Sequence, residues 1–143
     1  MTDPRTIRVD QFLPHPPARV WRALTDPDLL ARWLMPNDFR PAVGHVFTFR
    51  TEPRPGAGFD GVVHCAVLAL EPERLLRISW RGGPLDTTVT WTLVPEGRGT
   101  RLFLVHDGFD PGDPAQQLAA RILGQGWRSH VLAALERALA GPP

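Results

Sequence analysis

His106 has the clearest capacity for acid–base chemistry in this sequence. It shares one side of the segment 100–106 with Leu102 and Leu104, so its imidazole is expected to point into the interior. There it could act as a general base or orient a polar group of a bound molecule. A buried histidine more often completes a hydrogen-bond network of the core. Asp107 would point to the other side of the strand, so the two residues cannot form a catalytic dyad. We therefore assign no catalytic residue.

The other reactive side-chain types give no site. Cys65 is the only cysteine, which excludes an internal disulfide and a cysteine-based metal cluster. It lies in the apolar run 61–70, where an unpaired thiol usually behaves as a small hydrophobic residue. No two histidines have the spacing of metal ligands, and the carboxylates concentrate in turns. The sequence thus predicts neither a metal nor a cofactor.

The five tryptophans are the most informative group of side chains. Four of them are expected to project between a sheet and a long helix, and Trp21 is expected to face the sheet from a short helix. Such aromatic side chains could line a pocket for an apolar or aromatic small molecule, or they could simply fill the core. The predicted ligand-binding residues are Trp33, Phe47, Phe49, Trp80, Val89, Trp91, Leu104, His106, Leu123 and Trp127.

These side chains need a framework, and the longest element that could supply it is a helix over residues 114–140. Asp113 followed by Pro114 is a typical helix start, and apolar residues then recur at helical spacing as far as Gly141. At 1.5 Å per residue, the helix would be about 40 Å long. It could bury its apolar stripe only against several strands.

Two glycines interrupt this helix. Gly124 and Gly126 each cost about 1 kcal/mol relative to alanine in a helix interior. They could allow close packing or a kink beside Trp127, or they could leave room for a ligand against the sheet.

The remainder of the chain supplies the strands. Alternation of apolar and polar residues predicts a first strand, and two short amphipathic helices follow it. Five further strands, separated by tight turns, indicate an antiparallel meander and an α+β fold. The strands are expected at residues 7–13, 45–50, 61–70, 75–80, 87–94 and 100–106, and the short helices at 17–24 and 27–34.

Length and charge restrict the class of protein. A chain of 143 residues without an internal boundary fits one domain over residues 1–143. The net charge of +1, with scattered arginines and no lysine, makes a nucleic-acid site improbable. No apolar run reaches the ~20 residues of a membrane span, and the first residues lack the pattern of a signal peptide. We expect a cytoplasmic protein, either a monomer or a homodimer.

Four stretches together resemble the START-like (SRPBCC) superfamily, and more narrowly its branch related to the C-terminal domain of the activator of the heat-shock-protein-90 ATPase. The stretches are residues 16–27 (PPARVWRALTDP) with Leu30 and Trp33, residues 75–80, residues 99–109 (GTRLFLVHDGF), and residues 126–127 with Leu132, Leu135 and Leu139. The resemblance implies a helix-grip fold, in which a long C-terminal helix lies across a curved sheet of about six strands over a cavity.

The resemblance leaves several functions open. The leading hypothesis is a protein that binds an apolar or aromatic small molecule, such as a lipid or a polyketide, between the sheet and the helix. The loop 51–59, the helix around Trp33, or both would then act as a gate. The first alternative is a protein-interaction module of the co-chaperone type. The second is a cyclase or hydrolase that uses His106 with water.

Overall fold

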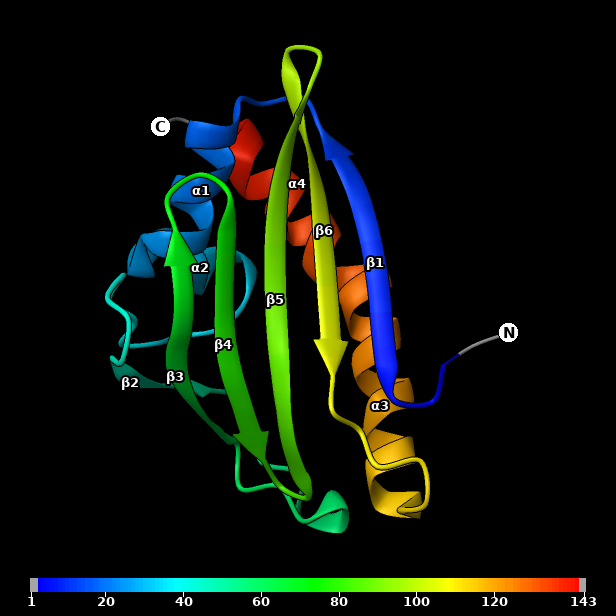
Figure 1. The fold of residues 1–143 in the computed structure, drawn as a ribbon. Helices are drawn as coiled ribbons and strands as arrows, with labels where there is room; N and C mark the ends of the chain where they lie inside the picture. The colour runs from blue at the N-terminus through cyan, green and yellow to red at the C-terminus, as the bar shows by residue number, and fades with distance from the viewer. Residues whose placement is uncertain (1–2, 142–143) are drawn as a thin grey trace.

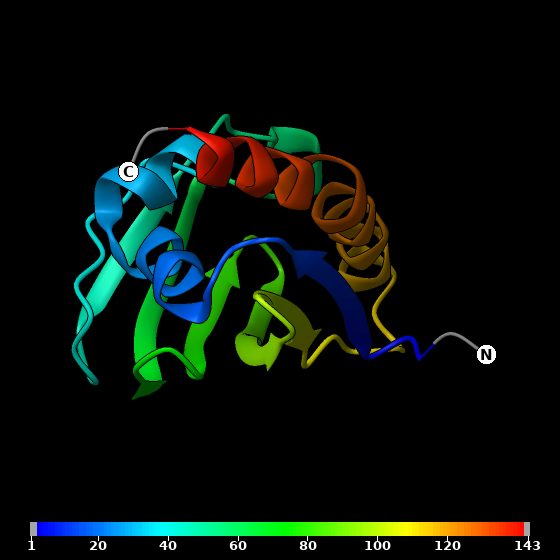
Figure 2. The same ribbon diagram turned by 90° about the horizontal axis from the view of Figure 1, so that it is seen from above.

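Six strands form one curved antiparallel sheet, and a long C-terminal helix crosses its concave side (Figures 1 and 2). The computed structural model describes residues 3–141. The strands are β1 (Thr6–Leu13), β2 (Val46–Arg50), β3 (Val62–Glu71), β4 (Leu75–Gly82), β5 (Leu85–Glu96) and β6 (Gly99–Asp107). The helices are α1 (Pro17–Thr25), α2 (Pro27–Trp33), a short 3-10 turn at Pro55–Ala57, α3 (Pro114–Gly126), a π-helical turn at Trp127–Val131, and α4 (Leu132–Ala140). The predicted α+β, helix-grip fold is confirmed.

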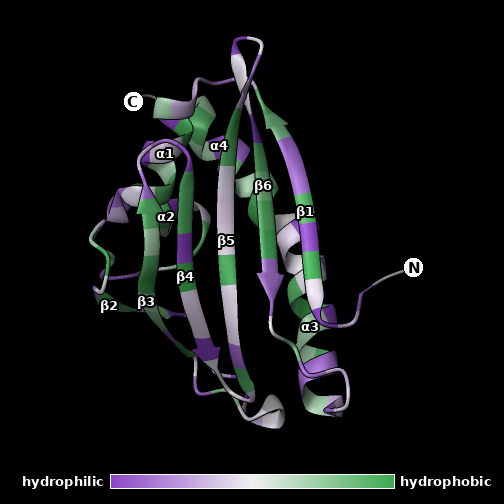
Figure 3. Cartoon of the chain, in the orientation of Figure 1, coloured by the Kyte–Doolittle hydropathy of each residue, from purple (hydrophilic) through white to green (hydrophobic). Residues whose placement is uncertain are grey.

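The strand order is β1-β6-β5-β4-β3-β2, so β1 pairs with the last strand rather than with its neighbour in sequence. On β5, alternate residues Thr87, Val89, Trp91 and Leu93 are buried, while the threonines between them are only partly covered. The same alternation of hydrophobic and hydrophilic residues is visible along β1 in Figure 3. Because side chains alternate across a strand, one face of the sheet is directed towards the helix.

The β4–β5 hairpin is tighter than the sequence predicts. We expected strands at 75–80 and 87–94, with six residues between them, whereas β4 continues to Gly82 and β5 begins at Leu85. Gly83 has a φ of +54°, a backbone conformation that glycine adopts without strain. Two residues are therefore enough to reverse the chain, and the antiparallel pairing of β4 with β5 extends further towards the turn than the sequence predicts.

The C-terminal helix follows one path from Pro114 to Ala140, but it is not uniform. The Asp113 carboxylate caps its start by accepting a hydrogen bond from the backbone N–H of Ala115 at 2.9 Å. The prediction of one helix over residues 114–140 holds except at Trp127–Val131, where one turn is π-helical. Such turns insert an extra residue into the helix and are often found at functional sites.

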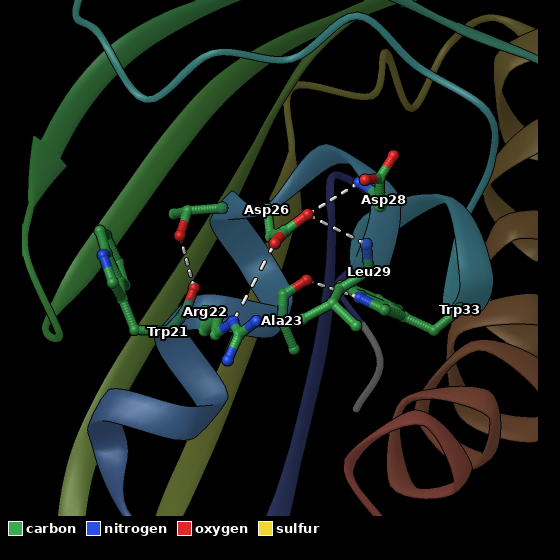
Figure 4. Close-up of polar contacts among 8 residues, drawn as sticks. Trp21, Arg22, Ala23, Asp26, Asp28, Leu29 and Trp33 are labelled. Atoms are coloured by element: carbon green, nitrogen blue, oxygen red, sulfur yellow. Dashed lines mark hydrogen bonds and ion pairs between the residues drawn. The ribbon is translucent and has the colours of Figure 1, made fainter. Parts of the chain in front are cut away.

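The two short helices meet at Asp26, whose carboxylate caps α2 (Figure 4). Its Oδ1 accepts hydrogen bonds from the backbone N–H groups of Asp28 at 2.9 Å and Leu29 at 3.4 Å. The indole of Trp33 then turns back and donates to the carbonyl of Ala23 at 2.8 Å. These bonds hold α1 and α2 together as one unit at the end of the sheet.

Arg19 ties this unit to the end of the C-terminal helix. Its guanidinium donates from Nε to the carbonyl of Leu139 at 3.1 Å and from Nη2 to the carbonyl of Gly141 at 2.7 Å. Carbonyls at the end of a helix have no partner within the helix, so a cation there satisfies them and complements the helix dipole.

Across residues 3–141, the helices are too short or too polar to cross a membrane.

Candidate ligand-binding site

A continuous series of ring contacts fills the space between the sheet and the C-terminal helix. Ring centroids of Phe47 and Phe49 on β2 are 5.3 Å apart, and Phe49 lies 5.6 Å from Trp80 on β4. Trp80 lies 5.7 Å from Trp127, and Trp91 on β5 lies 6.1 Å from Trp127. With Phe39 beside Phe47, and His106 and Phe109 at the other end, we call this set the aromatic cluster.

Most of the predicted ligand-binding residues belong to this buried region. Phe47, Phe49, Trp80, Trp91, His106 and Trp127 are members of the cluster, and Val89 and Leu104 are buried beside them. Leu123 is only half-buried, on α3. Trp33 is buried at the junction of α1 and α2, where its N–H is bonded to Ala23, and it makes no ring contact with the described members of the cluster. Their assignment to ligand binding stays a prediction.

His106 is the polar centre of the cluster and is fully buried. Trp127 donates its indole N–H to Nδ1 of His106 at 3.2 Å, so Nδ1 must be an unprotonated acceptor. The proton of the neutral ring is therefore on Nε2, which lies 2.8 Å from Oγ1 of Thr87. The Thr87 hydroxyl in turn donates to the carbonyl of Trp80 at 2.9 Å. Every polar atom of this chain of hydrogen bonds has a partner.

This chain gives His106 a structural role. Burial lowers its pKa from 6.5 to about 3, because the protonated form would lose its hydration without gaining a partner charge. Both ring nitrogens are already engaged, so neither is free to take a proton from a substrate in this arrangement. The Cys65 thiol is buried, and burial raises its pKa to about 12, so it is a poor nucleophile. Within residues 3–141, no cluster of side chains fits a metal ion.

Trp91 differs from Trp127 in the hydrogen bonding of its indole N–H. Its indole is 1% exposed, and its Nε1–H finds no acceptor among the described residues. A buried donor without a partner costs about 1–3 kcal/mol, and such groups are rare in folded proteins. The N–H is therefore a donor inside the cluster that a bound molecule could satisfy.

A pocket of about 270 Å³ lies at the end of the cluster, where the first residues of β1 face α3. Asp3, Pro4, Thr6 and Ile7 form one wall, and α3 with the following Arg128 forms the other. Phe109, in the loop after β6, completes it. We call this the β1–α3 pocket. None of the ten predicted ligand-binding residues is among those that line it.

The buried side of the pocket adjoins the aromatic cluster. Ile7 is the cross-strand partner of His106, and the Phe109 ring lies 4.7 Å from the His106 ring. Ile7 and Phe109 are both buried, so they separate the pocket from His106 by a single layer of side chains. Gly124 contributes to the opposite wall, where a Cβ would lie 3.1 Å from Nη1 of Arg128, so the missing side chain allows close packing of that guanidinium.

Sequence reasoning missed Phe109, Ile7 and the polar residues of the pocket. Phe109 follows Gly108 in a loop, outside the alternating pattern of β6, so strand periodicity gives no information about its direction. Gly108, with a φ of +101°, turns the chain so that Phe109 returns to the core. The sequence contained two signals for these residues. One is a single aromatic residue after a glycine, and the other is the apolar residue Ile7 at the start of the predicted first strand.

Comparison with known proteins agrees with this geometry. The family model described as "Activator of Hsp90 ATPase homolog 1-like protein" matches residues 14–140. The chain is 39% identical to protein MLL2253 from Mesorhizobium loti, with a TM-score of 0.82, covering 94% of this chain and 96% of that one. It is 28% identical to CalU16 from Micromonospora echinospora, with a TM-score of 0.74, covering 94% of this chain and 76% of that one.

A third similar structure is DynU16, a protein of the dynemicin biosynthetic locus. It is 27% identical, with a TM-score of 0.75, and the match covers 96% of this chain but 48% of DynU16. No curated protein matches the chain. With the fold, the four sequence stretches and the match over residues 14–140 in agreement, the chain belongs to the Activator of Hsp90 ATPase homolog 1-like family of the START-like superfamily.

Proposed function

We propose that this protein binds an apolar or aromatic small molecule between the curved sheet and the C-terminal helix, with the β1–α3 pocket as its entrance. The observation that carries the proposal is the position of this pocket. It reaches buried Ile7 and Phe109, and the other members of the aromatic cluster lie directly behind them. A concave site with an apolar inner wall and a few polar groups is the usual form of a small-molecule site.

The size of the pocket indicates a small guest. About 270 Å³ is just below the ~300–1,000 Å³ of most ligand pockets. A larger guest would have to displace Phe109, which follows directly after Gly108 in a connecting loop. The Phe109 ring lies between the pocket and His106, and His106 in turn contacts Trp127. Rotation of this ring would therefore open the pocket towards His106 and Trp127.

The proposed inner wall consists of the predicted ligand-binding residues within the cluster, chiefly Trp80, Trp91 and Trp127. Stacking against these rings would stabilise an apolar or aromatic body. A guest that carries a carbonyl, ether or hydroxyl oxygen would also satisfy the N–H of Trp91. The similarity to a protein of the dynemicin biosynthetic locus supports a small-molecule role.

A panel of lipids and aromatic polyketides tests the proposal by tryptophan fluorescence and thermal unfolding. A ligand at 100 times its Kd stabilises the folded state by about 2.7 kcal/mol, which corresponds to a Tm increase of several degrees. The variant Gly124→Leu should abolish binding, because Gly124 lines the pocket and a leucine side chain there would fill part of it. Even the added Cβ would lie 3.1 Å from Nη1 of Arg128.

The matched control is Gly126→Leu, two residues further along, where an added Cβ meets no heavy atom of the described residues within 4 Å. This variant should bind like the wild type. A panel without any effect on fluorescence or Tm would contradict the proposal. Equal binding by both leucine variants would show that the ligand does not use the β1–α3 pocket.

An exposed patch supports a second candidate, a protein-interaction module. On the outer face of the sheet, Phe12, Val94 and Phe103 are 40%, 43% and 39% exposed. Phe12 and Val94 both pair with Arg101, so they lie in one row across β1, β6 and β5. Following the family's description, titration with the middle domain of an Hsp90-type ATPase tests this candidate, with Phe12→Ser and Phe103→Ser as disrupting variants.

A further inference from the structure

We infer that the β1–α3 pocket selects small molecules that carry an anionic group, held by Arg121 and Arg128 while the apolar body lies against Ile7 and Phe109. This inference rests on the proposed function and specifies the chemistry of the ligand. A carboxylate is the simplest such group. Three observations support the inference: the placement of the two arginines, the lack of an ion pair between either of them and a described acidic residue, and the division of the pocket into a charged and an apolar part.

The two arginines lie on the same face of the C-terminal helix. Arg121, Gly124 and Arg128 are separated by three and four residues, which is the spacing of neighbours along one helix face. All three line the pocket. Nη1 of Arg128 is 3.1 Å from the position that a Cβ on Gly124 would occupy, so its guanidinium extends back over Gly124 towards Arg121. The absence of a side chain at position 124 leaves the space in which the guanidinium lies.

Neither guanidinium forms an ion pair with a described acidic residue. By contrast, Arg74, Arg81 and Arg101 are each paired with a carboxylate at 2.5–3.1 Å. Asp3 is the one acidic residue among those described in the pocket wall, and its Oδ1 already accepts a hydrogen bond from the backbone N–H of Arg5 at 2.9 Å. Two positive charges against one negative charge leave the pocket with a net positive charge.

Gln117, one of the other polar residues of the pocket, is already engaged through its amide. The amide of Gln117 is held by the carbonyls of Pro4 at 2.9 Å and Asp110 at 3.0 Å, at the end of the pocket nearest the start of α3. Ile7 and Phe109 are apolar and buried. A guanidinium donates two parallel N–H groups and therefore matches a carboxylate well. A molecule with one anionic end and one apolar end fits both parts of the pocket.

Octanoate and its neutral isostere octanamide separate the contribution of the charge from that of the chain. We expect isothermal titration calorimetry on the wild type to show octanoate binding at least about tenfold more tightly than octanamide, as a charge-assisted hydrogen bond would give. The double variant Arg121→Gln/Arg128→Gln should lose this preference and keep its affinity for octanamide. Arg137→Gln, an exposed arginine on α4 outside the pocket, is the control and should behave like the wild type.

The outcomes distinguish this inference from the proposed function. If octanoate and octanamide bind the wild type equally, the anionic selectivity is wrong while small-molecule binding stands. If the double variant retains the preference for octanoate, the two arginines are not the recognising groups. If neither compound binds, and the lipid and polyketide panel is also without effect, the proposed function and this inference are both wrong.

Discussion

Trp127 donates its indole N–H to Nδ1 of His106 across 3.2 Å, and this bond joins the C-terminal helix to β6, the neighbour of the edge strand β1, inside a fully buried aromatic cluster. Through Thr87, the same hydrogen-bond chain continues to the carbonyl of Trp80 on β4. Apolar contacts tolerate small sliding movements, whereas a buried hydrogen-bond chain is satisfied in one register only. The bond therefore fixes how the helix is seated on the sheet.

The first prediction concerns the pH dependence of stability. Below pH 6.5 an unfolded histidine takes up a proton, whereas His106 in the folded protein stays neutral until its pKa of about 3. The unfolded state binds more protons in this window, so the contribution of His106 is complete above pH 6.5 and falls by about 1.4 kcal/mol per pH unit as the pH decreases. Urea unfolding of the wild type and His106→Gln at pH 7.5 and pH 5 measures this. The wild type should lose about 2 kcal/mol more than the variant, and parallel losses would contradict the assignment.

The second prediction compares two tryptophans of equal burial. Trp91 and Trp127 are each 1% exposed, so replacing either with phenylalanine removes a similar volume from the core. Trp127→Phe also leaves Nδ1 of His106 without its donor, whereas Trp91→Phe removes an N–H that has no acceptor in the described part of the chain. The cost of an unpaired buried polar group is about 1–3 kcal/mol, so Trp127→Phe should be the more destabilising by that amount. Chemical denaturation of both variants checks this order, and the reverse order would show that the chain does not stabilise the fold.

The fold was predictable because its main signals are local. Asp113 before Pro114 marks the start of the long helix, and the alternation around Val89 and Trp91 marks the buried face of β5. The inward direction of His106 followed from the same alternation. Each of these inferences needs only a few neighbouring residues, and each agrees with the others on one arrangement.

The β1–α3 pocket was not predictable in the same way. It forms where Ile7, Phe109 and Gly124 come together from three distant parts of the chain. Periodicity reports the face on which a residue lies and not the distance between two elements. The π-helical turn at Trp127–Val131 also follows from no simple pattern, because it depends on how the helix must pass over the sheet.

The third prediction uses the two glycines of α3. Gly126 has helical backbone angles, with φ −60° and ψ −47°, and an added Cβ there lies more than 4 Å from every heavy atom that the structure describes around it. Gly126→Ala should therefore raise the free energy of unfolding by about 0.5–1 kcal/mol. Gly124→Ala should gain less, because its Cβ must displace the end of the Arg128 side chain from 3.1 Å. Thermal unfolding of both variants measures the difference. A larger gain at position 124 would mean that Arg128 does not lie over that glycine.

The last prediction concerns the link between α1 and the end of α4. Arg19 is partly buried and donates to the carbonyls of Leu139 and Gly141. Arg22, on the same helix, is exposed, and its Nε comes no closer than 4.0 Å to Oδ2 of Asp26. Hydrogen bonds from a charged group contribute about 1.5–3 kcal/mol each, while an exposed pair contributes less than about 0.5 kcal/mol. Arg19→Gln should therefore lower the free energy of unfolding by about 1–2 kcal/mol and speed amide exchange at the end of α4, whereas Arg22→Gln should do neither. Because both changes remove one positive charge from α1, a net-charge effect would act on them equally. Equal destabilisation would thus assign the effect to charge, and only a loss confined to Arg19→Gln fits a cation that caps the C-terminal helix.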